Sequence, residues 1–387
     1  MSKKYSDISI TWNGEITSTS GWSYYSRPII KELVKGGASV RLEMLPPTRP
    51  EQKLPKWWEE HFPILAKAQP GALRINHGGV GNQNKSTTGG PTVLLGHWET
   101  THIPRQWISG INENFDALWV PSEHLLTDET TALLKVPTGV VPLGIDKELF
   151  ANSSEKLEIA NVHRTKTVFL CVGQWNQRRN MTDIVVAYLS AFSSDDPVQL
   201  VLKTFGERNT LEERQKILQL VREIKGTINK PNLPEISVIQ DHLGYESFFA
   251  LMRRADIYCS TSRGESKSLS LMHAAAMGKQ CIYTDVLANK SLTALESELL
   301  YPCRYVLEPC ASTGHTYSAM DSWARPDVCH IASSMMQAYI DNVGKDLSKA
   351  RSGLKYSCEK AFSPSKSAEK IAELYRNMVK DNAVVVL

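Results

Sequence analysis

Short runs rich in β-branched and aromatic residues alternate with helix-periodic segments along almost the whole 387-residue chain. Such alternation predicts parallel sheets covered by helices, because each helix returns the chain to the same end of the sheet. The expected strands form two series: 7–12, 39–45, 72–77, 92–98, 117–122 and 138–144, then 167–173, 198–204, 236–241, 256–261 and 280–285. The predicted fold class is therefore α/β, with two doubly wound, Rossmann-like sheets.

A chain of this length exceeds the size at which a single core usually stops growing, which favours two domains facing across a cleft. The polar stretch at 146–166 separates the two series of strands. We expect an N-terminal acceptor-binding domain at 1–150 and a C-terminal nucleotide-binding domain at 151–365. The amphipathic segment 366–387 is predicted to be a helix that crosses back towards the N-terminal domain.

Composition and charge exclude several protein classes. The net charge of +3 gives no general affinity for polyanions, so a nucleic-acid partner gains no support from charge. Apolar runs are shorter than the roughly 20 residues that a spanning helix needs, so no integral membrane association is expected. The N-terminus lacks the apolar core of a secretory signal, which predicts a cytoplasmic protein. Three of the seven cysteines lie in strand-like runs, where cysteine behaves as a small buried hydrophobe, so reduced thiols are expected. The cysteines lack close C-x2-C pairs, so no metal site is expected.

Residues 256–285 read as a strand, a polar turn, a helix and a second strand. In a parallel sheet the turn lies at the carboxyl edge, where the backbone N–H groups that start a helix favour an anion. Ser266, Lys267 and Ser268 add further donors for a phosphate. The alternative is that one of the serines is an ordinary helix cap and that Lys267 is a solvated charge. Glu265 favours a binding site, because a carboxylate beside a phosphate is useful only for a neutral, hydroxyl-rich group.

The sequence "RRADIYCSTSRGESKSLSLMHAAAMGKQCIYTD" resembles the signature "RxADxxxxPSxxEGFGLxxLEAMAxGxPVIxT". That signature is typical of retaining GT-B nucleotide-sugar glycosyltransferases of group 1, also called glycosyltransferase family 4. The resemblance implies that Glu265 binds hydroxyls of the donor sugar and that backbone N–H groups from Ser266 to Leu269 hold its diphosphate. The family's second glutamate, which binds the ribose, is replaced here by His273, which cannot bridge two hydroxyls as a carboxylate does.

A second stretch, "VFLCVGQWNQRRNMTDIVVAYLSAF", resembles the family's "FLxVGxxxxRKNxxxLIxAF". The resemblance places Arg179 at the family's phosphate-binding lysine, with Arg178 just before it. A guanidinium can bind phosphate oxygens in a bidentate manner, so the charge is kept while the geometry changes. Lys203, near the end of another expected strand, is a further candidate for the donor phosphates.

The first half resembles the family more weakly. Gly21 lies between a strand and a helix, as the family's N-terminal glycine loop does, and is expected to help bind the donor. His97 ends a strand in "LLGHWETTHIP" and is the expected active-site histidine, with His102 as the alternative. Sugar rings or bases could stack on flat side chains in nearby loops, for which the candidates are Trp22, Trp57, Trp58 and Trp98.

Together these features predict a retaining hexosyl- or pentosyltransferase that uses a UDP- or GDP-sugar, without metal or cofactor. Glu265, His97 and Arg179 are the expected catalytic residues. The acceptor, which can be a glycan, lipid, protein or nucleobase, and the oligomeric state are left open. The alternatives are a nucleotide-sugar epimerase or phosphorylase, a non-catalytic nucleotide-sugar-binding protein, and a transferase acting on hydroxymethylated bases in DNA.

Overall fold

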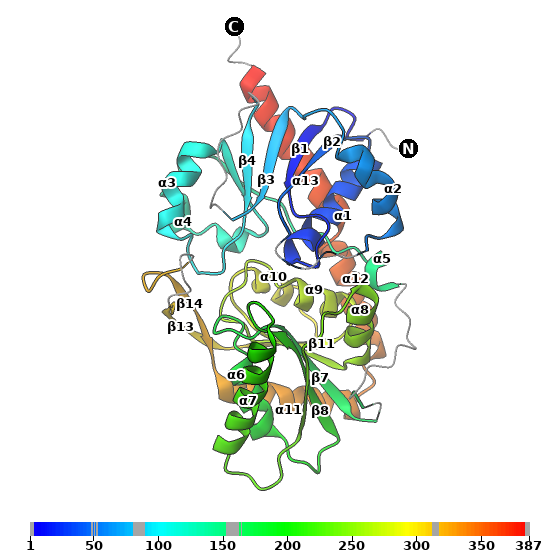
Figure 1. The fold of residues 1–387 in the computed structure, drawn as a ribbon, viewed down its shortest axis with the longest axis vertical. Helices are drawn as coiled ribbons and strands as arrows, with labels where there is room; N and C mark the ends of the chain where they lie inside the picture. Colours follow the sequence, from blue (N-terminus) through cyan, green and yellow to red (C-terminus); the bar gives the residue numbers. More distant parts are fainter. Residues whose placement is uncertain are drawn as a thin grey trace. The chain divides into compact units, whose positions relative to one another are not determined.

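The computed structural model describes residues 4–47, 49, 51, 53–79, 90–151, 162–163, 165–311 and 317–383 (Figure 1). The chain divides into two compact units. The first comprises Met1–Asp146 with Ala361–Leu387, and the second comprises Lys147–Lys360. Each unit has its own six-stranded sheet.

The first unit alternates strands and helices as the sequence pattern predicts. Its strands are β1 (Ser9–Gly14), β2 (Ser39–Met44), β3 (Leu73–Gly78), β4 (Thr92–Gly96), β5 (Ala117–Val120) and β6 (Thr138–Val140). Its helices are α1 (Gly21–Lys35), α2 (Lys56–Leu65), α3 (Arg105–Asn114), α4 (Asp128–Thr131) and α13 (Pro364–Ala383). All strand pairs are parallel, in the order β2-β1-β3-β4-β5-β6.

The last helix of the chain, α13, packs on α1 within the first unit. The contact uses a stripe of buried residues at helical spacing: Ala368, Ile371, Ala372 and Tyr375. At the start of α13 the Ser367 hydroxyl donates to the carbonyl oxygen of Pro142 at 2.7 Å. The chain thus leaves this unit after β6 and completes it with its last helix.

The second unit repeats the architecture. Its main sheet contains β7 (Thr167–Gln174), β8 (Val198–Phe205), β9 (Glu235–Ile239), β10 (Ile257–Ser260), β11 (Gln280–Thr284) and β12 (Leu300–Cys303), in the parallel order β12-β11-β10-β7-β8-β9. Its helices are α5 (Glu148–Ala151), α6 (Met181–Ala191), α7 (Leu211–Thr227), α8 (Tyr245–Arg254), α9 (Leu269–Ala276), α10 (Lys290–Thr293), α11 (Val328–Gly344) and α12 (Ser348–Ala361).

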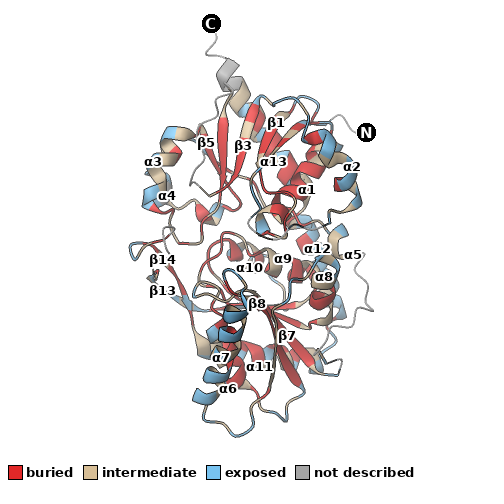
Figure 2. Cartoon of the chain, viewed as in Figure 1, coloured by how far each residue is buried: buried red, intermediate tan, exposed pale blue. Residues whose placement is uncertain are grey.

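Every residue of β10 and β11 is buried, which shows that helices cover both faces of the central strands (Figure 2). One face packs on α6 and α11 through a large apolar cluster that includes Phe169, Tyr188 and Phe192. In both units the strand order reverses once, between β1 and β3 in the first and between β7 and β10 in the second. In open parallel sheets such switch points are where ligands bind.

The doubly wound α/β fold class is confirmed by the two sheets, but some elements differ from the prediction. Residues 123–133, where the alternation of strands and helices predicts a helix between two strands, form only a 3-10 turn at Glu123–Leu125 followed by the short α4. The sequence analysis missed α12, which buries only Leu354 and Cys358 and so has little apolar signal. It also missed the antiparallel hairpin of β13 (Tyr305–Pro309) and β14 (Ser322–Pro326). Over the described ranges, no helix is long and apolar enough to cross a membrane.

Candidate functional site

The two loops at the switch point of the second unit are joined to each other by hydrogen bonds. One loop follows β7 and the other follows β10, and these strands are neighbours in the sheet. The Arg263 backbone N–H donates to the carbonyl oxygen of Arg178 at 2.8 Å. The Asn180 amide donates to the carbonyl oxygen of Thr261 at 3.2 Å, and the Arg178 guanidinium donates to that of Gly264 at 2.8 Å. The two loops therefore form one rigid edge.

This edge brings Arg178, Arg179 and Glu265 together as an arginine–glutamate cluster. Arg179 Nη1 donates to Glu265 Oε1, and Arg178 Nη1 lies 3.5 Å from Glu265 Oε2. Glu265 is only 3% exposed, whereas the Arg179 side chain is 29% exposed. The sequence analysis expected these residues in one site, but not their mutual pairing. Both guanidinium groups compensate the charge of a buried carboxylate.

The local backbone holds Arg179 in place. Asn180 adopts a left-handed conformation with φ of 57°, which ends the loop and starts α6. Asn176 Oδ1 accepts from the Arg179 backbone N–H at 2.8 Å. A Cβ at Gly173 would lie 3.3 Å from Arg179 Cδ, so glycine leaves room for that side chain at the end of β7. The sequence analysis did not identify Asn176 and Asn180, although both lie close to the two arginines.

The start of α9 lacks the ordinary cap that the sequence allowed. Ser268 is the N-cap residue, but its side chain makes no cap hydrogen bond to the helix. Instead, its hydroxyl lies 3.2 Å from the hydroxyl of Ser260. Helix α9 therefore starts just after the segment Glu265–Lys267, and the Ser268 side chain does not cap its first backbone N–H groups. Such a helix start, beside two arginines, suits an anion.

The two candidate lysines of this site have a lowered pKa. Burial lowers the pKa of Lys267 to about 8, and its Nζ lies 3.3 Å from the Ser291 hydroxyl. Lys203, near the end of β8, is 7% exposed, and burial lowers its pKa to about 8 while Asp241 partly opposes the shift. Within the described residues, no hydrogen bond or ion pair joins Lys203 to the arginine–glutamate cluster. Binding a phosphate would favour the charged form of either lysine.

His273 lies on α9 in an apolar environment. It is buried, and its ring lies edge-on to Phe249 with 5.2 Å between ring centroids; Phe150 is the next ring, at 6.3 Å. Burial lowers the pKa of His273 to about 4, so the imidazole is neutral near pH 7. A glutamate at this position would place a carboxylate beside Phe249 and Phe150, whereas a neutral imidazole suits such contacts.

The switch point of the first unit contains His97 with a second histidine. His97 directly follows β4 and lies beside Trp22, with 4.9 Å between ring centroids. Trp22 follows Gly21, the exposed first residue of α1. His77, at the end of β3, lies 3.0 Å from His97, measured between the two Nε2 atoms. The sequence analysis missed His77, although it ends a predicted strand exactly as His97 does.

The start of α1 already has a carboxylate. Ser20 caps the helix by accepting from the Ser23 backbone N–H at 3.3 Å. Glu15 Oε2 accepts from the hydroxyls of Ser18 and Ser20 at 2.7 and 2.6 Å, and Glu15 is buried. A buried negative charge at this helix start disfavours a phosphate there. The loop at Gly21 is therefore better suited to a hydroxyl-rich group than to a diphosphate.

The expected aromatic stacking residues divide into two groups. Trp58 and Trp98 are 2% and 1% exposed, so they belong to the core and cannot stack on a ligand; this part of the prediction is wrong because both rings pack inward. Trp57 is partly exposed and stacks on His61 with 4.1 Å between centroids. His102, the alternative to His97, instead lies 3.1 Å from Glu129.

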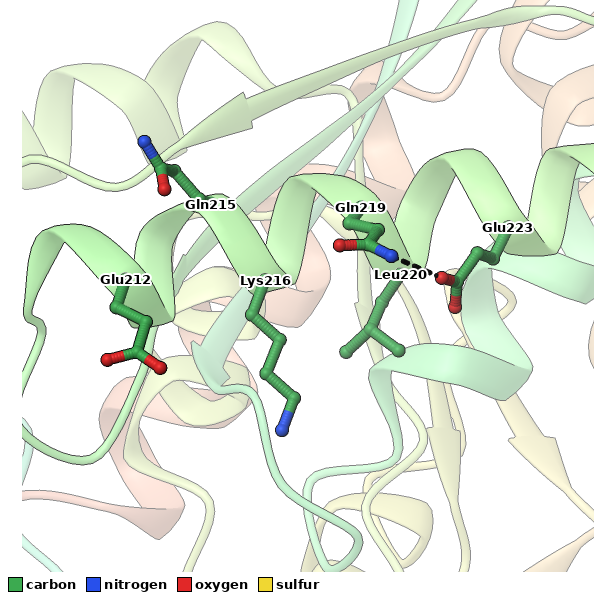
Figure 3. A pocket seen from close by; sticks show the side chains of 6 residues that line it. All are labelled: Glu212, Gln215, Lys216, Gln219, Leu220 and Glu223. Carbon is green, nitrogen blue, oxygen red and sulfur yellow. Dashed lines mark hydrogen bonds between the residues drawn. The ribbon is translucent and has the colours of Figure 1, made fainter.

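A hollow of about 380 Å³ lies along the exposed side of α7 (Figure 3). It is lined by Glu212, Gln215, Lys216, Gln219, Leu220 and Glu223, all from this one helix, and Gln219 donates to Glu223 at 2.8 Å. None of the predicted site residues lines it. Mixed charges on one exposed helix face are a solvated surface, so we assign no ligand to this hollow.

The described part of the chain contains no group of three or more histidine, cysteine or acidic side chains placed to hold a metal ion. The seven cysteines are free thiols, and all except Cys329 are buried. Burial raises the pKa of the Cys171 and Cys303 thiols to about 12. These side chains behave as small core residues, in agreement with the strand-like runs in which they occur.

Comparison with known proteins identifies the fold but no family. No protein-family model and no curated protein sequence matches the chain. Solved structures do match. A sucrose-phosphate synthase from Thermosynechococcus elongatus is 15% identical with a TM-score of 0.61, covering 98% of each chain. A trehalose-6-phosphate structure from Escherichia coli, bound with UDP-2-fluoro glucose, is 10% identical with a TM-score of 0.61, covering 95% of this chain and 99% of the other.

A third structure belongs to a study of glycosyl transfer with retention that used bisubstrate glycomimetics of trehalose-6-phosphate synthase. It is 10% identical with a TM-score of 0.55, covering 84% of this chain and 80% of the other. Such similarities over nearly the whole chain confirm the predicted GT-B fold. At these identities they establish the fold alone.

Proposed function

We propose that this protein is a glycosyltransferase that binds a nucleoside-diphosphate sugar on the second unit and transfers the sugar to an acceptor hydroxyl. The observation that supports this most directly is the arginine–glutamate cluster at the sheet's switch point, next to the uncapped start of α9. A cationic edge with a single carboxylate matches a ligand that has two phosphates and a hydroxyl-rich sugar.

In this proposal the leaving diphosphate is stabilised by positive charge. Among the described residues, the Arg179 guanidinium donates one hydrogen bond to a side chain, from Nη1 to Glu265. In the proposal, its Nε and Nη2 groups donate to phosphate oxygens. Arg178 already donates to Gly264 and therefore contributes mainly charge. Lys267 and the first N–H groups of α9 add donors on the same loop. Such preorganised donors are commonly the largest single contribution to catalysis.

Glu265 has two roles in the proposal. Without a ligand it holds both guanidinium groups at the edge. With the donor bound, its oxygens accept hydrogen bonds from sugar hydroxyls while the diphosphate takes over part of the arginine pairing. His97 and the loop at Gly21, in the first unit, are assigned to hydroxyl groups of the substrates, since Glu15 makes that loop unsuitable for phosphate.

A UDP-sugar is the first donor to test, because the similar structure from Escherichia coli is bound with UDP-2-fluoro glucose. Retention of the anomeric configuration is also part of the proposal. It is supported by the sequence resemblance and by the similar structure from the study of glycosyl transfer with retention. No metal ion is assigned a role, and the acceptor is proposed only as a hydroxyl compound.

The test is ligand binding followed by turnover. Thermal unfolding should be measured with UDP-glucose, GDP-mannose and ADP-glucose, since a donor at 100 times its Kd stabilises the native state by about 2.7 kcal/mol. Arg179→Met should abolish the shift. Arg222→Met, which removes an exposed guanidinium on α7, is the matched control and should leave the shift unchanged. No shift with any nucleotide sugar would refute the proposal.

Turnover then separates transfer from the alternatives. Incubation with donor alone identifies an epimerase by isomerised sugar, whereas a non-catalytic protein binds the donor and releases no nucleotide with any acceptor. Binding of hydroxymethylated duplex DNA that weakens with rising salt would identify a nucleic-acid acceptor. A sugar acceptor should yield a product whose anomeric configuration, measured by NMR, is that of the donor.

A further inference from the structure

A chain of buried hydrogen bonds leads from the core of the first unit to His97. The Trp12 indole N–H donates to the Ser26 hydroxyl oxygen at 3.2 Å. Ser26 Oγ lies 2.8 Å from His77 Nδ1, and His77 Nε2 lies 3.0 Å from His97 Nε2. Trp12, Ser26 and His77 are each at most 1% exposed, while His97 is partly exposed. The chain therefore runs from three fully buried groups to one that solvent can reach.

The chemistry of the groups fixes the direction of these bonds. An indole nitrogen can only donate, so Ser26 Oγ accepts from Trp12. Among the described residues, the remaining partner of the Ser26 hydroxyl is His77 Nδ1, and a buried hydroxyl proton that is not donated is costly. The Ser26 hydroxyl must then donate to Nδ1. Because His77 accepts at Nδ1, its proton is on Nε2, and it donates to His97 Nε2.

The last link determines the state of His97. Since His97 accepts at Nε2, the neutral ring has its own proton on Nδ1. Both rings must be neutral for this order to hold. Burial supports that, because it lowers the pKa of His97 to about 4 and that of His77 well below its ordinary value, with the neighbouring His97 as a second cause for His77.

The packing around the two rings allows little reorientation. Tyr25 lies 4.9 Å from His77 and 5.1 Å from His97 between ring centroids, and Trp22 lies 5.2 and 4.9 Å from the same rings. A Cβ at Gly14 would lie 3.2 Å from His77 Cβ, so a larger residue there would crowd the ring. The hydrogen-bond chain and the enclosing rings thus hold both imidazoles in one orientation.

We propose that His77 is a positioning residue that, with Ser26 and Trp12, fixes His97 as an Nδ1–H hydrogen-bond donor. With its proton on Nδ1 and its Nε2 accepting from His77, His97 is not a general base in the proposed reaction. This inference rests on the proposed function for the part that concerns substrate, whereas the protonation states of the two rings are independent of any activity.

The test is direct observation of the ring nitrogens. Long-range ¹H–¹⁵N correlation spectra of the ¹⁵N-histidine-labelled full chain resolve the tautomers of its 10 histidines, with His77 and His97 assigned from single variants. At pH 7 we expect an Nε2–H tautomer for His77 and an Nδ1–H tautomer for His97. Ser26→Ala should convert both rings to tautomer mixtures. Thr11→Val, which removes another buried hydroxyl of the same unit, is the control and should leave both tautomers unchanged.

Kinetics test the positioning role separately. Ser26→Ala should lower kcat about two- to five-fold with little change in the KM for the donor, because only the competent tautomer is active. His77→Leu should lower kcat by more, and His77→Gln, which keeps an N–H near the position of Nε2, should restore most of it. A His97 protonated mainly on Nε2, or a His97 tautomer unchanged by Ser26→Ala, would overturn the inference. If the tautomers are as expected but no donor is turned over, the proposed function fails and the protonation order stands.

Discussion

Arg179→Met tests the pairing in the arginine–glutamate cluster. Methionine keeps most of the apolar stem and removes only the charged group. Glu265 then keeps Arg178 at 3.5 Å as its remaining partner. Breaking a fully buried ion pair costs about 3–5 kcal/mol. Because Arg179 is 29% exposed and Arg178 remains, we expect a smaller loss in the free energy of unfolding, about 1–2 kcal/mol.

A double-mutant cycle separates this stability effect from catalysis. Glu265→Gln removes the buried charge. It should therefore lower the free energy of unfolding much less in the Arg179→Met variant than in the wild type, which corresponds to a coupling energy of about 1–2 kcal/mol. The same double variant should not regain activity, since Arg179→Met and Glu265→Gln each remove a group assigned to the donor. Each single variant should lower kcat on the order of 100-fold.

Urea denaturation provides the free energies. The two units can unfold separately, so the transition should be followed by pulsed hydrogen exchange of peptides that contain Trp175 or Trp323, which both belong to the second unit. A coupling energy below about 0.3 kcal/mol would show that the pair is not formed in solution. Wild-type turnover by Arg179→Met would refute the assignment of this residue to the leaving diphosphate.

Three further predictions concern the two lysines of the site, His273 and the hairpin residue Glu308. Lys203 and Lys267 have a pKa of about 8 without ligand, so donor affinity, measured by calorimetry, should fall as the pH rises above 8, and Lys267→Met should make that fall shallower. Folding favours the neutral form of His273, so the free energy of unfolding falls as the pH drops from 6.5 towards 4. At pH 5 His273 accounts for a loss of about 2 kcal/mol. Urea denaturation should therefore show that His273→Gln loses about 2 kcal/mol less than the wild type between pH 7 and pH 5. Glu308, on the hairpin, pairs with Arg263 of the loop that follows β10. Glu308→Gln should therefore raise the Kd for the donor several-fold in the same calorimetric assay. An unchanged Kd would show that the hairpin does not support this loop.

Much of the fold could be predicted because the strands are strongly patterned. In the part of the chain that the structure describes, eleven of the fourteen strands begin or end within a few residues of the predicted runs, since buried parallel strands are continuous apolar stretches. The missed elements have weak patterns. The hairpin of β13 and β14 exposes Val306 and Leu307, so its residues do not show the alternation of a half-buried strand.

The site was predictable where a residue type is unusual for its position and not where the residue is ordinary. Two adjacent arginines at a helix start and a glutamate before another helix attract notice, and they lie together. The pairing between them could not be read from the sequence, because it depends on contacts across 86 residues. His77 was predictable, because a histidine that ends a parallel strand lies at the same edge as His97. Its Ser26 partner was not, since serine inside a helix has no distinct signal.

The charges at the edge of the second sheet explain why a carboxylate belongs in a phosphate site. Arg178 and Arg179 would repel each other if both were left without a counter-ion on a partly buried edge. Glu265 provides that counter-ion and so holds both guanidinium groups at this edge. In the proposed function, the diphosphate of the donor would replace one anionic partner with another, and the freed carboxylate oxygens would accept from sugar hydroxyls. A nucleoside diphosphate without a sugar would leave the displaced Glu265 with fewer partners, so the cluster should favour the complete donor over the diphosphate alone.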